Sequence, residues 1–253
     1  MDAAHTIRDA IARVTALRAQ AQNSPALGQA LRAVKQLQAQ RFAGTYTDLL
    51  DQGPYGAATQ FFLSELYGAH DFAERDAQFA RIADALQTLF PKQVVATATT
   101  LAQLHVLTEE LDCALARAWM EQPLEFDTPQ ALRYVRAWRQ MAASAQRARQ
   151  LQMVVQTGKE LERLTRLPGL RLMLKLMRKP ALASGLGNLQ RFLESGFDTF
   201  ADLAQQPDGV ATFLAWVQQR ETGWMDWFDG ADEDACVSRL AACLAQGTSP
   251  HSG

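Results

Sequence analysis

The chain has 253 residues, of which 48% are hydrophobic and 21% are charged, a composition that supports a sizeable core and excludes wholesale disorder. Fifteen glycines and nine prolines are too few for a turn-rich β-sandwich, and the abundant Ala, Leu, Gln and Arg favour helices. The net charge of −2 conceals a strong asymmetry along the chain.

The N-terminal segment and the cysteines indicate the cellular setting. The first residues, MDAAHTIRDAIARV, contain two aspartates and no apolar stretch, so they do not resemble a secretory signal. No apolar run approaches the roughly 20 residues that span a bilayer. Cys113, Cys236 and Cys243 form no CxxC pair, which argues against a disulfide framework and a structural zinc site. We therefore expect a soluble cytoplasmic protein without a transmembrane segment.

Helical periodicity begins at the N-terminus. Apolar residues recur at steps of three and four along residues 4–22, which predicts an amphipathic helix. Ser24 can cap the next helix and Pro25 can occupy its first position. The same apolar pattern continues to about residue 50.

Three further helices are predicted before the middle of the chain. Residues 55–67 form a short and very apolar segment. Asp71 and Glu74 are spaced as a capping box, which predicts the start of the following helix. After a break at Phe90-Pro91, a longer helix is expected from Lys92 to about Met120.

The loop at residues 121–129 is the best candidate boundary between two halves. We expect an N-terminal helical half over residues 1–127, a C-terminal helical half over 128–246 and a disordered tail at 247–253, with one continuous domain as the alternative. The helices expected in the second half are 129–167 (either long or bent near Gly158), 170–179 (stopped by Pro180), 188–195, 200–205, 210–229 and 233–246. No segment alternates as a strand does, so the predicted fold is all-α, a bundle of about nine or ten helices.

A glutamate lies on an apolar helix face within the string FFLSELYG, residues 61–68. Glu65 follows two phenylalanines by three and four residues and so shares their face. A carboxylate there needs a partner or stays protonated, and Arg75, Arg81 and His105 are the candidate partners. One interpretation is a buried ion pair that fixes helix packing. The other is a carboxylate that binds a ligand or metal.

The same string carries a family resemblance. FFLSELYG followed by DFAERDAQFARI resembles the bacterial FFLEELY-motif proteins over about residues 42–112. Ser64 replaces the first glutamate of that motif, so Glu65 is the better candidate for any shared role. The resemblance implies a shared fold and supplies no activity.

A second group of polar residues lies on the predicted helix 92–120. His105, Glu109 and Asp112 are spaced i, i+4 and i+7 and share one stripe. Imidazole and carboxylate at this spacing can share a metal, but the usual Glu-x-x-His pattern and a second internal histidine are missing, so we predict no metal site and identify no cofactor. The candidate ligand-binding residues are Glu65, Tyr67, Arg75, Asp76, His105 and Glu109.

The charge asymmetry predicts a basic segment. Residues 128–191 hold 13 basic and two acidic residues, a net charge of +11, whereas residues 194–234 hold ten acidic residues and one basic residue. Such a split is typical of an anion-binding face, or of acidic and basic helices that neutralise each other in the fold. The candidate anion- or partner-binding residues are Arg133, Arg136, Arg139, Lys175, Arg178 and Lys179. The predicted partner is a protein or an anionic surface, and no motif supports nucleic acid.

Within this segment, residues 170–179 (LRLMLKLMRK) are both basic and apolar, which suits an anionic membrane, a groove on a partner, or a buried helix with snorkelling stems. The tryptophans near the C-terminus, Trp216, Trp224 and Trp227, predict core packing. No Walker loop, GxGxxG turn, nucleophile elbow or HExxH is present, so the sequence does not decide whether the protein is an enzyme. A non-enzymatic interaction module with a basic face is preferred. A small-molecule- or metal-dependent enzyme with a polar pocket around Glu65, Arg75 and His105 is the alternative.

Overall fold

A computed structural model describes residues 2–65, 72–122 and 128–247, and within these ranges the predicted all-α class is confirmed, with twelve helices. In chain order they are α1 (Ala3–Asn23), α2 (Pro25–Thr45), α3 (Thr47–Leu50), α4 (Pro54–Glu65), α5 (Ala73–Leu89), α6 (Lys92–Glu121), α7 (Gln130–Met141), α8 (Ser144–Thr165), α9 (Leu170–Ala183), α10 (Gly187–Leu203), α11 (Gly209–Gly230) and α12 (Glu233–Gly247). Asp71, half of the predicted capping box, lies outside the described residues.

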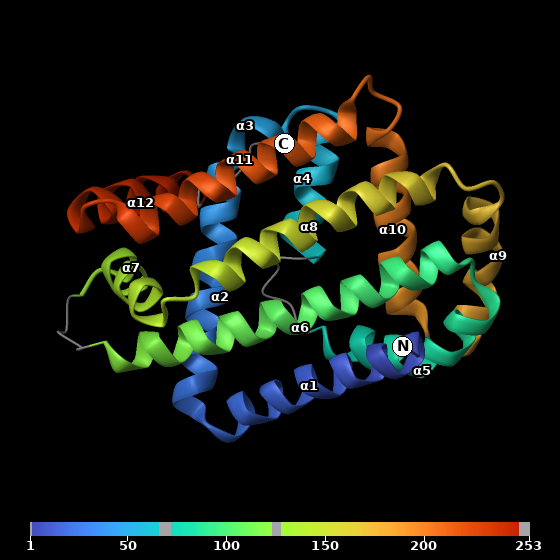
Figure 1. Ribbon diagram of the computed structural model, residues 1–253, viewed down its shortest axis with the longest axis horizontal. Coiled ribbons are helices and arrows are strands. Elements are labelled where there is room, and N and C mark those ends of the chain that lie inside the picture. Colours follow the sequence, from blue (N-terminus) through green and yellow to red (C-terminus); the bar gives the residue numbers. More distant parts are fainter. Residues whose placement is uncertain (1, 66–71, 123–127, 248–253) are drawn as a thin grey trace.

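Four long helices form a layer. α1, α6, α8 and α11 lie side by side in that order, and each neighbouring pair is in contact (Figure 1). α2 crosses this layer near one end, where α7 and α12 also lie, and α10 crosses it near the other end (Figure 1). α4 packs on α10, and α9 packs on the outer side of α10. Elements from before and after residues 123–127 therefore pack against each other.

The helix ends follow their capping residues. Asp2 accepts a hydrogen bond from the backbone N–H of Ala4, and Ser24 Oγ accepts one from Leu27 at 3.4 Å. Pro25 occupies the first turn of α2, where a backbone N–H would have no partner within the helix, so the N–H that proline lacks is not missed. The predicted cap at Ser24 is thereby confirmed.

Three predicted boundaries in the second half are wrong. The helix expected over 129–167 is two helices, because Ala142 has a left-handed φ of 48° that ends α7. α9 continues through Pro180 to Ala183. Pro180 lacks the N–H that would donate to the carbonyl of Leu176, but Leu176 is exposed, so water can take the place of that donor.

The segments expected at 188–195 and 200–205 are one helix, α10, and α8 runs unbroken through Gly158. Both helices use glycine for close packing instead of a break. A Cβ at Gly196 would lie 3.1 Å from the ring of Phe61, and a Cβ at Gly158 would lie 2.6 Å from Leu214.

Of the tryptophans predicted to pack in the core, Trp224 is buried, and Trp216 and Trp227 are partly buried and pack against core residues. Trp224 and Phe228 are buried and stack with ring centroids 5.4 Å apart. Trp138 packs on Phe228, and its Nε1 donates to Asp229 at 2.8 Å. Cys113, Cys236 and Cys243 are buried free thiols, and burial raises the pKa of each.

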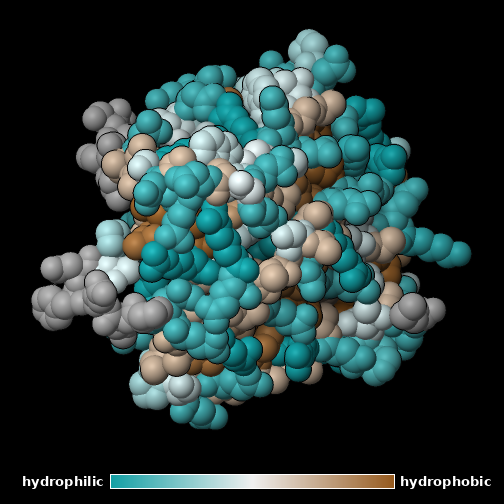
Figure 2. Space-filling view, turned by 60° about the vertical axis from the view of Figure 1, so that its left-hand side comes forward, coloured by the Kyte–Doolittle hydropathy of each residue, from teal (hydrophilic) through white to brown (hydrophobic). Residues whose placement is uncertain are grey.

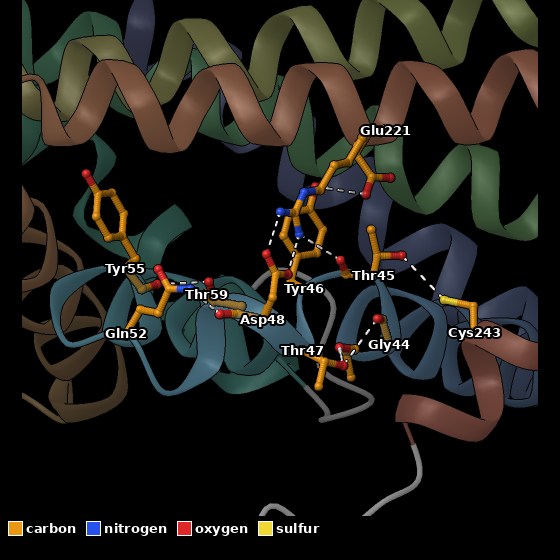
Figure 3. A network of polar contacts seen from close by, with 12 residues as sticks. Gly44, Thr45, Tyr46, Thr47, Asp48, Gln52, Tyr55, Thr59, Glu221 and Cys243 are labelled. Atoms are coloured by element: carbon orange, nitrogen blue, oxygen red, sulfur yellow. Dashed lines mark hydrogen bonds and ion pairs between the residues drawn. The ribbon is translucent and has the colours of Figure 1, made fainter.

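The junction of α2 and α3 with α11 is held by polar contacts (Figure 3). Tyr46 donates its hydroxyl to Glu221 at 3.1 Å, and Glu221 also accepts two hydrogen bonds from the buried Arg41. Arg220 donates to both carboxylate oxygens of Asp48. These contacts fix the crossing of α2 against the layer.

The outer surface is mixed. Figure 2 shows hydrophilic side chains over most of one face, with hydrophobic side chains in small separate areas between them. Across the described ranges, every helix is too short or too polar to cross a membrane, as predicted.

Candidate functional site

A cavity of about 270 Å³ lies inside the bundle, and side chains from the layer and from the crossing helices line it. Most of the wall is apolar and comes from leucines and phenylalanines of α4, α5, α6, α8 and α10. Polar side chains of the wall lie mainly on α2, α6 and α8, and α5 adds Arg75 and Asp76. The sequence predicted a polar pocket around Glu65, Arg75 and His105 but not its large apolar wall.

The first polar group, called here the Asp76 cluster, consists of Arg18, Glu65, Arg75, Asp76 and His105. Arg18 donates to Asp76 Oδ2 at 2.7 Å, and His105 Nε2 lies 2.8 Å from the same oxygen. Arg75 donates to Glu65 Oε2 at 3.1 Å, and its Nε lies 3.7 Å from Asp76 Oδ1. One buried carboxylate thus joins α1, α5 and α6.

Opposing effects act on Asp76. Burial would raise the pKa of its carboxyl, but the hydrogen bond from His105 and the charges of His105 and Arg18 hold the pKa below its ordinary value. The Arg75 guanidinium stacks over the rings of Phe72 and Phe192, at 4.0 and 4.6 Å from the centroids. The cluster is therefore charged and compensated, and it borders the apolar wall.

The second polar group, called here the Asp112 cluster, lies farther along α6 and consists of Lys35, Glu109, Asp112 and Arg147. Lys35 donates to Glu109 at 2.6 Å and lies 4.0 Å from Asp112. Burial would lower the pKa of Lys35, but the charges of Asp112 and Glu109 raise it above its ordinary value. Burial raises the pKa of the Asp112 carboxyl, which is fully enclosed.

The predicted ligand-binding residues largely meet at this cavity. Glu65, Arg75, Asp76, His105 and Glu109 all line it, and the first four form one cluster. Tyr67 lies outside the described residues.

Arg81, a candidate partner for Glu65, instead donates to the backbone carbonyls of Ser184 and Gly185. The partner of Glu65 is Arg75. His105, the third candidate, bonds to Asp76.

The α6 stripe does not form a metal site. His105 bonds to Asp76, and Glu109 bonds to Lys35, so the stripe residues face different partners. No group of three His, Cys, Asp or Glu side chains suited to a metal occurs in residues 2–65, 72–122 and 128–247.

The predicted basic residues have individual partners. Arg136 pairs with Glu233 at 2.8 Å, and Arg178 with Glu194 at 2.6 Å. Arg139 donates to the carbonyls of Phe228 and Ala231.

Arg133 donates to the Trp119 carbonyl and stacks over its ring. Lys175 and Lys179 form no ion pair within the described part of the chain. Whether these residues bind a partner remains a prediction.

Three basic residues of the Asp76 and Asp112 clusters escaped sequence reasoning. Arg18, Lys35 and Arg147 belong to ordinary amphipathic helices, and each reaches its partner across a helix contact. The spacing of Lys35, Gln38 and Arg41 at steps of three along α2 is the signal that places these polar residues on one stripe.

Comparison with known proteins gives a family and no activity. A family model described as "Domain of unknown function (DUF8198)" matches residues 17–234. The searches of curated proteins and of solved structures returned no match.

Proposed function

The chain belongs to the DUF8198 family, and we propose that it binds a small amphipathic molecule in its interior cavity. The observation that carries the proposal is a cavity of about 270 Å³ with a mostly apolar wall and a charged, compensated cluster at its border. Convergent polar groups in a largely apolar pocket are typical of ligand sites.

Energetics favour an occupant. Apolar surface that a bound molecule removes from water stabilises the complex by about 25 cal/mol per Å². An apolar molecule in the cavity also gains dispersion contacts with the surrounding leucines and phenylalanines.

The polar part of the wall gives the ligand its orientation. Asp76 and Glu65 are already neutralised by Arg18 and Arg75, so this cluster offers hydrogen bonds without a large unbalanced charge. His105 lines the cavity and uses Nε2 for Asp76, which fixes the plane of its ring.

A neutral fluorescent probe tests this proposal. N-phenyl-1-naphthylamine is titrated into the wild type, into Ala98→Leu, which fills the cavity, and into Ala96→Leu, an exposed control on the same helix. We expect the affinity of Ala98→Leu to fall at least fivefold and that of Ala96→Leu to be unchanged. Equal affinity in the two variants would place the probe elsewhere and contradict the proposal.

A second candidate function uses the outer face of α9. Leu172, Leu176 and Leu182 are 61–67% exposed, and they lie next to Lys175 and Lys179. Exposed leucines interspersed with lysines on one face of a helix suit the surface of an anionic membrane. Arg171 and Arg178 pair with acids of α10 and hold α9 in place.

Vesicle sedimentation tests this second candidate. Binding to phosphatidylglycerol vesicles is expected to exceed binding to phosphatidylcholine vesicles, and Lys175→Glu with Lys179→Glu is expected to abolish the difference. Arg149→Glu, an exposed charge on α8, is the control. Equal sedimentation with both lipids would refute the candidate.

A further inference from the structure

The described residues contain three buried side-chain nitrogen or oxygen atoms without a hydrogen-bond partner, and all three lie on α8. They are Nε and Nη2 of Arg147 and Oγ1 of Thr157. Both residues line the cavity. Buried polar atoms in folded proteins almost always have partners, so these exceptions along one cavity wall point to a water or a bound molecule that supplies the missing partners.

The partners that Arg147 does have are weak. Its Nη1 donates to Gln150 at 3.2 Å and lies 3.9 Å from Asp112 Oδ1. Asp112 also faces Lys35, so one carboxylate serves two cations at long distances. The guanidinium also lies 5.0 Å from the centroid of the Trp138 ring, a cation–π contact that leaves Nε and Nη2 without a hydrogen bond.

The free edge of Arg147 has a defined chemistry. Nε–H and the outer Nη2–H of a guanidinium point the same way and match the two oxygens of one carboxylate. Every other cation of the wall that is described above has a carboxylate within hydrogen-bond distance. The Asp112 cluster has two cations and two carboxylates, so Arg147 offers free hydrogen-bond donors without a large excess of positive charge. This favours a monoanion over a phosphate monoester, which carries up to two negative charges.

The apolar wall continues from this edge along the same helix. Arg147 is followed on one stripe of α8 by Leu151, Val154, Gly158 and Leu161, which all line the cavity. A ligand held by its head at Arg147 therefore extends its body along this stripe. The buried Thr157 hydroxyl lies midway along it.

We propose that the ligand of this cavity is an amphipathic carboxylic acid whose carboxylate binds the Nε–Nη2 edge of Arg147. This inference rests on the proposed function, since it identifies the head group of the molecule that the cavity holds. Thr157 provides a second contact for a ligand that carries an oxygen along its chain.

Competition between an acid and its ester tests the inference. Dodecanoic acid and methyl dodecanoate are each used to displace N-phenyl-1-naphthylamine at pH 7.5 from the wild type, Arg147→Met, Arg147→Lys and the exposed control Arg149→Met. In the wild type and in Arg149→Met, the acid is expected to displace the probe at a concentration at least tenfold lower than the ester. In Arg147→Met this preference is expected to disappear, and Arg147→Lys is expected to keep part of it because the charge remains without the paired edge.

The outcomes distinguish the carboxylate head group from binding in the cavity as such. Equal competition by acid and ester in the wild type would refute the carboxylate head while leaving cavity binding intact, and this comparison needs no variant to fold. An acid preference that persists in Arg147→Met would overturn the assignment to Arg147. Failure of the probe itself to bind the wild type would refute the proposed function together with this inference.

Discussion

Replacing Asp76 with asparagine is the sharpest test of how the Asp76 cluster holds the bundle together. Asp76 is 4% exposed and accepts from Arg18 on α1 and from His105 on α6. Asparagine keeps the shape and one acceptor oxygen but removes the charge. Arg18 then remains in a largely buried position without its counter-charge.

The expected magnitude follows from the geometry. At 2.7 Å and an effective dielectric constant of about 20, the attraction between Arg18 and Asp76 is roughly 6 kcal/mol. Desolvation offsets part of it, and breaking one side of a buried pair costs about 3–5 kcal/mol. For a chain of this length, that loss lowers Tm by roughly 6–20 °C.

Asp84→Asn is the matched control. Asp84 lies on the same helix, α5, and pairs with Arg8 of the same partner helix, α1, at 2.8 Å, but both side chains are exposed. An exposed pair contributes little to stability, because water screens the attraction. The free energy of unfolding of both variants is measured by urea denaturation. A loss in Asp76→Asn no larger than that in Asp84→Asn would refute the claim that burial makes the Asp76 cluster structurally important.

Three further predictions concern acid stability, packing and thiol reactivity. The fold lowers the pKa of Asp76, so its ionised form stabilises the protein at pH values above the ordinary aspartate pKa of about 4. The difference in free energy of unfolding between wild type and Asp76→Asn, measured by urea titration, should therefore narrow as the pH falls from 5 to 2. Gly44→Ala should lower the free energy of unfolding by about 3 kcal/mol, because the new Cβ would lie 2.0 Å from the carbonyl oxygen of Cys243. Gly223→Ala on α11, where the space around the Cβ is open, should raise the free energy of unfolding by about 0.5–1 kcal/mol. Equal effects of the two substitutions in thermal unfolding would contradict this packing. The three cysteines are buried with raised pKa values, so Ellman's reagent should react with them only after denaturation, and rapid labelling of the native protein would show that a thiol is accessible.

The candidate site was partly predictable because a charge on an apolar face demands a partner. The position of Glu65 beside two phenylalanines indicated an ion pair, and Arg75 was among the three candidates. The identity of the partner required the tertiary structure, because ten residues of chain separate the two side chains in sequence and helix packing brings them together. Asp76, predicted as one of the six candidate ligand-binding residues, is the carboxylate on which three helices converge.

The helical class and most helix positions were determined by local sequence, because apolar spacing and caps such as Ser24 act within one or two turns. The break at Ala142, the continuity of α10 through Gly196 and the cavity itself were decided by tertiary packing. The physical reason is the distance in sequence over which each feature is set. The residues of one helix determine which of its faces is apolar, but the space left between helices depends on how helices from distant parts of the chain cross. The same limit hid Arg147, whose missing partner is visible only once its neighbours surround it.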